Sequence, residues 1–130
     1  MSKSPSNEMP HQVGRRAELI VQKNLWRRNY RVKDVSRMKL GYDILVNEKY
    51  RVEIKSMRGP STTIKLDPSK FDVFCVIALN DFRDFIYYLR DKKDIKLFFR
   101  STGVIALSTE IIKKHFTRKP QEVFGEPITK

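Results

Sequence analysis

The chain of 130 residues is long enough for one hydrophobic core and too short for two ordinary domains. Hydrophobic residues make up 40% of it, so disorder of the whole chain is excluded. The single cysteine excludes an internal disulfide and a cysteine-based metal site. The formal net charge of +12, from 27 Lys and Arg residues against 15 Asp and Glu residues, indicates that the partner is a polyanion.

The polar ends of the chain and its longest apolar run indicate where the protein resides. The first 12 residues lack the apolar stretch of a signal peptide, and the longest apolar run, residues 73–79, is too short to span a bilayer. We therefore expect a soluble, cytoplasmic protein without membrane contact. Residues 1–12 and 120–130 are expected to be tails on either side of one folded domain, residues 13–119.

The first periodic segment, residues 13–29, predicts an amphipathic helix. Its opposite face is rich in arginine and lysine, which gives the helix a cationic outer surface. The apolar residues that recur at helical spacing and are expected to face the core are Val13, Ala17, Ile20, Val21 and Leu25.

After residue 29 the hydrophobic period changes to two, which predicts strands. A three-stranded meander is expected at residues 30–35, 42–46 and 50–55, with a turn at residues 47–49. Further elements are expected as an edge strand at 62–66, a strand covered on both faces at 73–79, a strand at 85–89, and a helix at 108–115 capped by Ser108 or Thr109. Together these elements predict an α/β domain with a mixed central sheet flanked by helices.

The hairpin within this meander places three charged side chains on one face. Its apolar residues share a face only if the loop has an odd length, so a three-residue loop places Ile44 opposite Val52. Asp43 is then opposite Glu53. Lys55 shares the face of Glu53 because side chains alternate along a strand.

Two carboxylates and an amine on one face suit the hydrolysis of a phosphodiester. Asp43 and Glu53 would repel each other alone, and a hard cation such as Mg²⁺ between them removes that repulsion. A water beside such a metal is the natural nucleophile, which Lys55 can orient while it neutralises charge developing on phosphorus. The alternative is a solvent-exposed strand face, on which Glu53 pairs with Lys55 or Arg51.

The combination of a basic helix, a strand with Asp43 and a strand with Glu53-Ile54-Lys55 resembles the PD-(D/E)XK nuclease superfamily. The stretch Gly14-Arg15-Arg16-Ala17-Glu18 is similar to the motif of its first helix, and Gly41-Tyr42-Asp43 is similar to the strand that carries the motif aspartate. Tyr42 stands where the proline that gives the family its name would be. The resemblance spans about a third of the chain, from Gly14 to Lys55.

The resemblance implies a restriction-endonuclease-like single domain, as in restriction enzymes and archaeal Holliday-junction resolvases. It implies that Asp43 and Glu53 bind Mg²⁺ or Mn²⁺, with the Ile54 carbonyl as a third ligand and Glu18 as an auxiliary one. Lys55 would be the catalytic lysine beside these two carboxylates. A homodimer is expected because two sites are needed to cut both strands of a duplex, and no small-molecule cofactor is expected.

Basic and hydroxyl side chains near this site are candidates for binding the phosphate backbone of DNA. They lie on the first helix, in the loop before Asp43, or directly after Lys55, and they are Arg15, Arg16, Lys23, Arg37, Lys39, Ser56 and Arg58.

The sequence thus predicts a metal-dependent endonuclease that hydrolyses phosphodiester bonds in DNA. Two alternatives remain open. One is a nucleic-acid-binding module with the same fold and no activity, and the other is a basic accessory protein that binds an acidic protein or ribosomal RNA. The presence of Asp43, Glu53 and Lys55 favours the enzyme, because neither alternative needs them.

Overall fold

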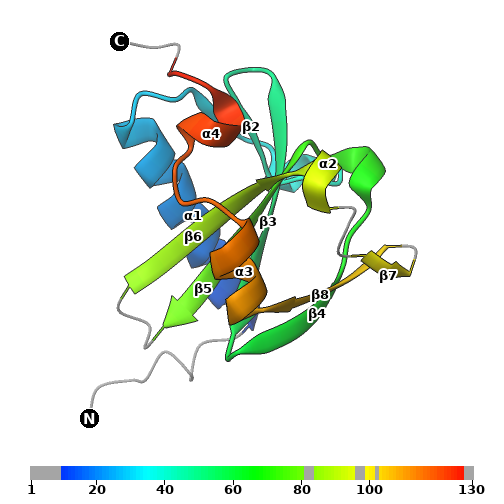
Figure 1. The fold of residues 1–130 in the computed structure, drawn as a ribbon. Coiled ribbons are helices and arrows are strands. Elements are labelled where there is room, and N and C mark those ends of the chain that lie inside the picture. The colour runs from blue at the N-terminus through cyan, green and yellow to red at the C-terminus, as the bar shows by residue number, and fades with distance from the viewer. Residues whose placement is uncertain (1–9, 81–83, 96–98, 102, 128–130) are drawn as a thin grey trace.

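A mixed five-stranded sheet forms the centre of the computed structural model, which describes residues 10–80, 84–95, 99–101 and 103–127 (Figure 1). Its strands lie in the order β1-β2-β3-β5-β6, and they are β1 (Val32–Asp34), β2 (Ile44–Val46), β3 (Tyr50–Arg58), β5 (Val73–Asn80) and β6 (Asp84–Asp91). β3 and β5 are parallel, and the other neighbouring pairs are antiparallel. The predicted α/β class and the three-stranded meander are confirmed.

A second, three-stranded sheet lies to one side of the first (Figure 1). Its order is β4-β8-β7, and its strands are β4 (Ser61–Lys65), β8 (Val104–Ser108) and β7 (Phe99–Ser101). β4 is an edge strand, as predicted. β7 and β8 were not predicted, because β7 is only three residues long and the short apolar run of β8, residues 104–107, does not distinguish a strand from part of a buried helix.

Helices cover both faces of the central sheet. The helices are α1 (Pro10–Arg27), α2 (Lys92–Ile95), α3 (Thr109–His115) and α4 (Gln121–Phe124), with the short 3-10 turns η2 (Ser36–Met38) and η3 (Pro68–Lys70). In Figure 1, α1 lies behind the sheet and α3 in front of it. The hydroxyl of Ser108 accepts the N–H of Ile111 at 3.2 Å, so Ser108 is the predicted N-cap of α3.

The buried stripe of α1 differs from the predicted one at a single described position. Ala17, Val21 and Leu25 are at most 1% exposed, as predicted. Ile20 is 36% exposed, so its placement in the core is wrong. Ile20 lies about 100° around the helix axis from Val21, on the side that turns away from the sheet. Val13 lies within α1, but its side chain is outside the part that the structure describes.

Two hydrophobic cores lie on opposite faces of the central sheet. The first packs under α1 and α4, and the second packs against β4, β8 and α3. β5 contributes Cys75 and Ile77 to the first core and Phe74 and Val76 to the second, and all four side chains are fully buried. This confirms the prediction that the strand is covered on both faces, and it explains why every position from 73 to 79 is apolar.

The segment expected to be a C-terminal tail contains α4. Phe124 is 3% exposed and packs against the rings of Tyr30 and Tyr50. The hydroxyl of Tyr30 donates to the carbonyl of Gly125 at 2.8 Å. Phe124, with Val123 packed beside it, therefore belongs to the first core.

Among the residues that the structure describes, no helix is both long enough and apolar enough to cross a membrane.

Candidate active site

The hairpin of β2 and β3 has the predicted register, with Ile44 opposite Val52 and Val46 opposite Tyr50. Asn47 and Glu48 form the turn at φ values of 55° and 58°, the left-handed conformation that tight hairpin turns require. Asn47 is 7% exposed, and its side-chain oxygen accepts the N–H of Arg31 at 3.1 Å. The N–H of Asn47 donates to the carbonyl of Arg31 at 2.8 Å, so the turn is fixed to the start of β1.

Asp43 stands where the pairing of β2 with β3 ends. Its N–H donates to the carbonyl of Val52 at 2.9 Å, and its Oδ2 accepts the N–H of Ile54 at 2.7 Å. β3 continues to Arg58, past the point where its pairing with β2 ends. The carboxylate of Asp43 takes the place of the backbone carbonyl that a longer β2 would offer to the N–H of Ile54. The carbonyl of Ile54 faces the same edge as its N–H, because both groups of a strand residue point to one side.

Glu53 lies next to Asp43, as the register predicts. Burial, followed by the hydrogen-bonding contact with Asp43 and its negative charge, raises the pKa of Glu53 to about 8, against the weaker effect of nearby Lys55. The alternative partner Arg51 is bound elsewhere, with its Nη2 atom 3.0 Å from Oδ1 of Asp72. Two carboxylates held in contact in this way favour a bound proton or a bound cation.

Glu18 of α1 approaches the same carboxylate from the helix side. Burial and then the negative charge of Asp43 raise the pKa of Glu18 to about 6. Oε1 of Glu18 lies 3.3 Å from Nη1 of Arg15. Glu18 therefore lies near the Asp43–Glu53 pair, as the motif resemblance implies.

Arg15, a predicted phosphate contact, is held here by three acceptors. Besides Glu18, it donates to the hydroxyl of Ser36 at 3.0 Å and to Oδ2 of Asp34 at 2.7 Å. Burial opposes ionisation of Asp34, but hydrogen bonds from Arg15 and Ser36 outweigh it and lower the pKa of Asp34 well below its ordinary value. Asp34 and Ser36 were not predicted, because their only signal in the sequence is their place just before the loop that leads to Asp43.

These side chains surround an open cleft of about 440 Å³. The residues that line it are Gly14, Arg15, Glu18, Ser36, Asp43, Ile54, Lys55 and Ser56. Lys55 and Ser56, which the sequence marks as candidates for catalysis and phosphate binding, thus lie at the cleft. Glu53 is not among the lining residues and reaches the site through its contact with Asp43.

The donor atoms around Asp43 and Glu53 determine whether a metal ion fits this site. Within the described residues, no group of three or more His, Cys, Asp or Glu side chains is arranged to hold a metal ion. Asp43, Glu53 and the Ile54 carbonyl nevertheless offer oxygen donors near one point, and Mg²⁺ commonly takes one or two carboxylates and keeps several waters. The donor set therefore fits a hard divalent cation, with Glu18 near it rather than in one cluster with the pair.

The remaining predicted phosphate contacts lie on α1, in and after η2, and at the end of β3. Arg16 and Lys23 are exposed on α1, and Arg37 and Lys39 are exposed in and after η2. The side chain of Arg58, at the end of β3, lies outside the described part of the structure.

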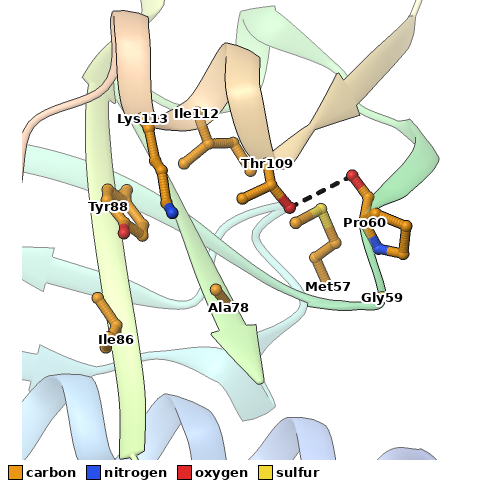
Figure 2. A pocket seen from close by; sticks show the side chains of 9 residues that line it. All are labelled: Met57, Gly59, Pro60, Ala78, Ile86, Tyr88, Thr109, Ile112 and Lys113. Atoms are coloured by element: carbon orange, nitrogen blue, oxygen red, sulfur yellow. Dashed lines mark hydrogen bonds between the residues drawn. The ribbon is translucent and has the colours of Figure 1, made fainter. Parts of the chain in front are cut away.

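A second pocket, of about 390 Å³, lies between the central sheet and α3 (Figure 2). Its lining residues are Met57, Gly59, Pro60, Ala78, Ile86, Tyr88, Thr109, Ile112 and Lys113. The side chain of Thr109 donates to the carbonyl of Pro60 at 3.3 Å, as Figure 2 shows, and this contact joins α3 to the turn after β3. The lining is mostly apolar and contains no acidic residue, so this pocket lacks the groups of a metal-dependent site.

No family model and no curated protein sequence matches the chain. Among solved structures, the Holliday junction resolvase Hjc of the archaeal hyperthermophile Archaeoglobus fulgidus is similar over 87% of this chain and 96% of its own. The TM-score is 0.61 and the sequence identity is 13%. This chain has the fold of that resolvase. The restriction-endonuclease-like fold predicted from the motifs is thereby confirmed, and at this identity the likeness concerns the fold alone.

Proposed function

We propose that the protein is a divalent-metal-dependent endonuclease that hydrolyses phosphodiester bonds in DNA. The observation that carries this proposal is the placement of Asp43 opposite Glu53 at the open edge of β3, where Asp43 accepts the N–H of Ile54, with Lys55 and Glu18 at the same cleft. A structural sheet edge has no need for two half-buried carboxylates in contact, because their mutual repulsion destabilises the fold. The resolvase fold and the net charge of +12 support the same assignment.

The residues at the cleft have distinct tasks in this proposal. Asp43, Glu53 and the Ile54 carbonyl would hold Mg²⁺ or Mn²⁺, which when bound would polarise a water and the scissile phosphate. Lys55 places a positive charge where negative charge develops in the transition state. Arg15, held by Asp34 and Ser36, fixes Glu18 at the rim of the cleft.

Further parts of the proposal are a cytoplasmic location, a homodimer that cuts both strands, and the absence of a small-molecule cofactor. Exposed Arg16, Lys23, Arg37 and Lys39, together with Ser56 and Arg58, would bind the phosphate backbone.

The test is a cleavage assay with labelled duplex, four-way junction, single-stranded DNA and RNA, each in Mg²⁺ and in EDTA. Asp43→Asn and Lys55→Met are expected to lower the cleavage rate at least about 100-fold, as removal of a group that stabilises the transition state does. Glu48→Gln is the matched control, because Glu48 is an exposed carboxylate on the hairpin turn, at the opposite end of β2 from Asp43.

Cleavage that persists in EDTA or in both variants would contradict the proposal. Binding to DNA without cleavage of any of the four substrates would instead favour the inactive nucleic-acid-binding module.

A further inference from the structure

Helix α1 carries the only tryptophan of the chain, and the candidate active site does not use it. Trp26 is 69% exposed, more than any other large hydrophobic residue that the structure describes. An indole ring of this size leaves a large apolar area in water unless a partner covers it.

Trp26 lies on the side of α1 that borders β1, in line with the cleft. Arg15, Glu18, Gln22 and Trp26 follow one another at spacings of three and four residues and so share one side of the helix. Arg15 and Gln22 both donate to Oδ2 of Asp34, at 2.7 and 3.2 Å, which holds this side against β1. Trp26 is eight residues beyond Glu18, about 12 Å along the helix axis.

Three hollows follow one another along this side of α1. The first is the cleft already described. The second, of about 360 Å³, is lined by Leu19, Gln22, Lys23, Trp26 and Val32. The third, of about 510 Å³, is lined by Trp26, Arg27, Asn29, Tyr30, Arg31 and Val32. Trp26 lines both the second and the third, so its ring separates two open spaces, each of which also borders a cationic side chain.

We propose that Trp26 stacks on an unpaired base of a nucleic-acid strand that runs from the cleft along α1, with Lys23 and Arg27 beside its phosphates. This inference rests on the proposed function and names the substrate class: nucleic acid with a single-stranded segment near the cleavage point. Bases inside a duplex are covered on both faces by their neighbours, so the flat face of Trp26 is available only to a base outside the stack.

The charge around Trp26 favours nucleic acid over a second copy of this chain. A symmetric contact through Trp26 would bring Lys23 and Arg27 of both copies together, and like charges at an interface oppose association. A strand of nucleic acid offers phosphates to the same cations and bases to the ring.

Because Trp26 is the only tryptophan, its fluorescence reports this contact directly. The Asp43→Asn protein in EDTA is titrated with a blunt duplex, with single-stranded oligothymidine, and with the same duplex carrying a single-stranded extension. We expect the two single-stranded probes to quench the emission strongly and the blunt duplex to leave it nearly unchanged. Saturated binding of all three probes without a change in emission would overturn the inference.

Two substitutions separate stacking from apolar contact, with binding measured by the anisotropy of a labelled extended duplex. Trp26→Phe keeps an aromatic plane and is expected to bind within a few-fold of the parent protein. Trp26→Leu is expected to weaken binding about tenfold or more without altering the dependence on salt. Lys23→Ala is expected to lower the salt slope by about one unit.

Different experimental results would contradict the stacking of Trp26 and the nuclease activity. Quenching by single-stranded probes in a protein that cleaves nothing would support the stacking contact and contradict the nuclease. If instead the parent protein cleaves DNA and Trp26→Leu binds the extended duplex as tightly as the parent, the nuclease would be supported and the stacking contact contradicted. Self-association that Trp26→Leu abolishes, measured by sedimentation, would identify a second copy as the occupant and overturn the inference.

Discussion

Glu53 has a strongly raised pKa, chiefly because it is buried and then because Asp43 lies beside it. Its pKa of about 8 lies well above the ordinary value of 4.5, so the folded protein without metal retains a proton there that the unfolded chain has lost. The stability associated with this proton is fully present below pH 4.5 and is lost as the pH rises through 8.

The substitution Glu53→Gln removes this dependence of stability on pH, because glutamine does not titrate. In EDTA, the variant is expected to match the parent protein at pH 4.5 and to be more stable by about 2 kcal/mol at pH 8.5, less than the full shift implies because Glu53 is partly exposed to solvent. The measurement is urea unfolding at several pH values. Identical pH profiles of the two proteins would contradict the raised pKa of Glu53.

The sequence predicted which charged side chains of the hairpin lie together, but not the residues that support Arg15 beside them. Asp43, Glu53 and Lys55 follow from alternation along two paired strands, which is a local pattern. Asp34 and Ser36 hold Arg15 from 19 and 21 residues away, and no periodicity encodes such a contact. The exposure of Ile20 and Trp26 could not be predicted from the sequence either, because it depends on where β1 packs against the helix.

At the scale of elements, the hairpin turn sets the register that brings Asp43 and Glu53 together. Asn47→Ala is expected to destabilise the protein by about 2 kcal/mol, because alanine disfavours a φ of 55° and cannot accept the N–H of Arg31. Asn47→Gly tolerates the φ value and should lose only about 1 kcal/mol. Chemical unfolding of both variants measures the difference, and equal losses would show that backbone strain plays no part.

Arg51 and Asp72 connect β3 to the start of β5. Two guanidinium nitrogens of Arg51 donate to the carboxylate of Asp72 at 3.0 and 3.1 Å, and chiefly this bonding lowers the pKa of Asp72. The stabilisation is therefore present above the ordinary pKa of 3.8 and is lost as the pH falls below it.

Asp72→Asn tests this connection. We expect a loss of about 1 kcal/mol at pH 7, since both side chains are about one-third exposed, and a difference that narrows below pH 4. Unfolding in urea at pH 7 and pH 3 provides the measurement. Glu48→Gln at the exposed Arg31–Glu48 pair serves as the control and should change stability by less than about 0.5 kcal/mol.

Helices and strands whose pattern lies within one segment of the sequence were predictable, and those that depend on contacts between distant segments were not. The meander, β5 and α3 were predicted because their periodicity or capping is contained within each segment. The second sheet pairs β4 with β8 at positions 39 to 47 residues apart in the sequence, from Lys65–Val104 to Ser61–Ser108, and nothing in either strand alone indicates that pairing. α4 is a single turn that a buried Phe124 holds in place, within a polar segment.

On the scale of the whole molecule, the excess positive charge is expected to act through a limited set of side chains. Arg37→Ala and Lys39→Ala should each weaken DNA binding similarly for all sequences and lower the salt slope by about one unit. Lys114→Ala is the control, because Lys114 is exposed on α3, on the opposite face of the sheet from α1. Titrations at several salt concentrations measure the slopes, and a slope that falls equally in the control would contradict a localised binding surface.

Cys75 gives the protein an internal probe of its own opening. The chain has no other cysteine, the side chain is fully buried in the middle of β5, and burial raises the pKa of its thiol. A thiol reagent can therefore react only after β5 separates from the helices and strands that cover it. The labelling rate in native buffer would thus measure how often the centre of the sheet opens, without denaturant and without an introduced label.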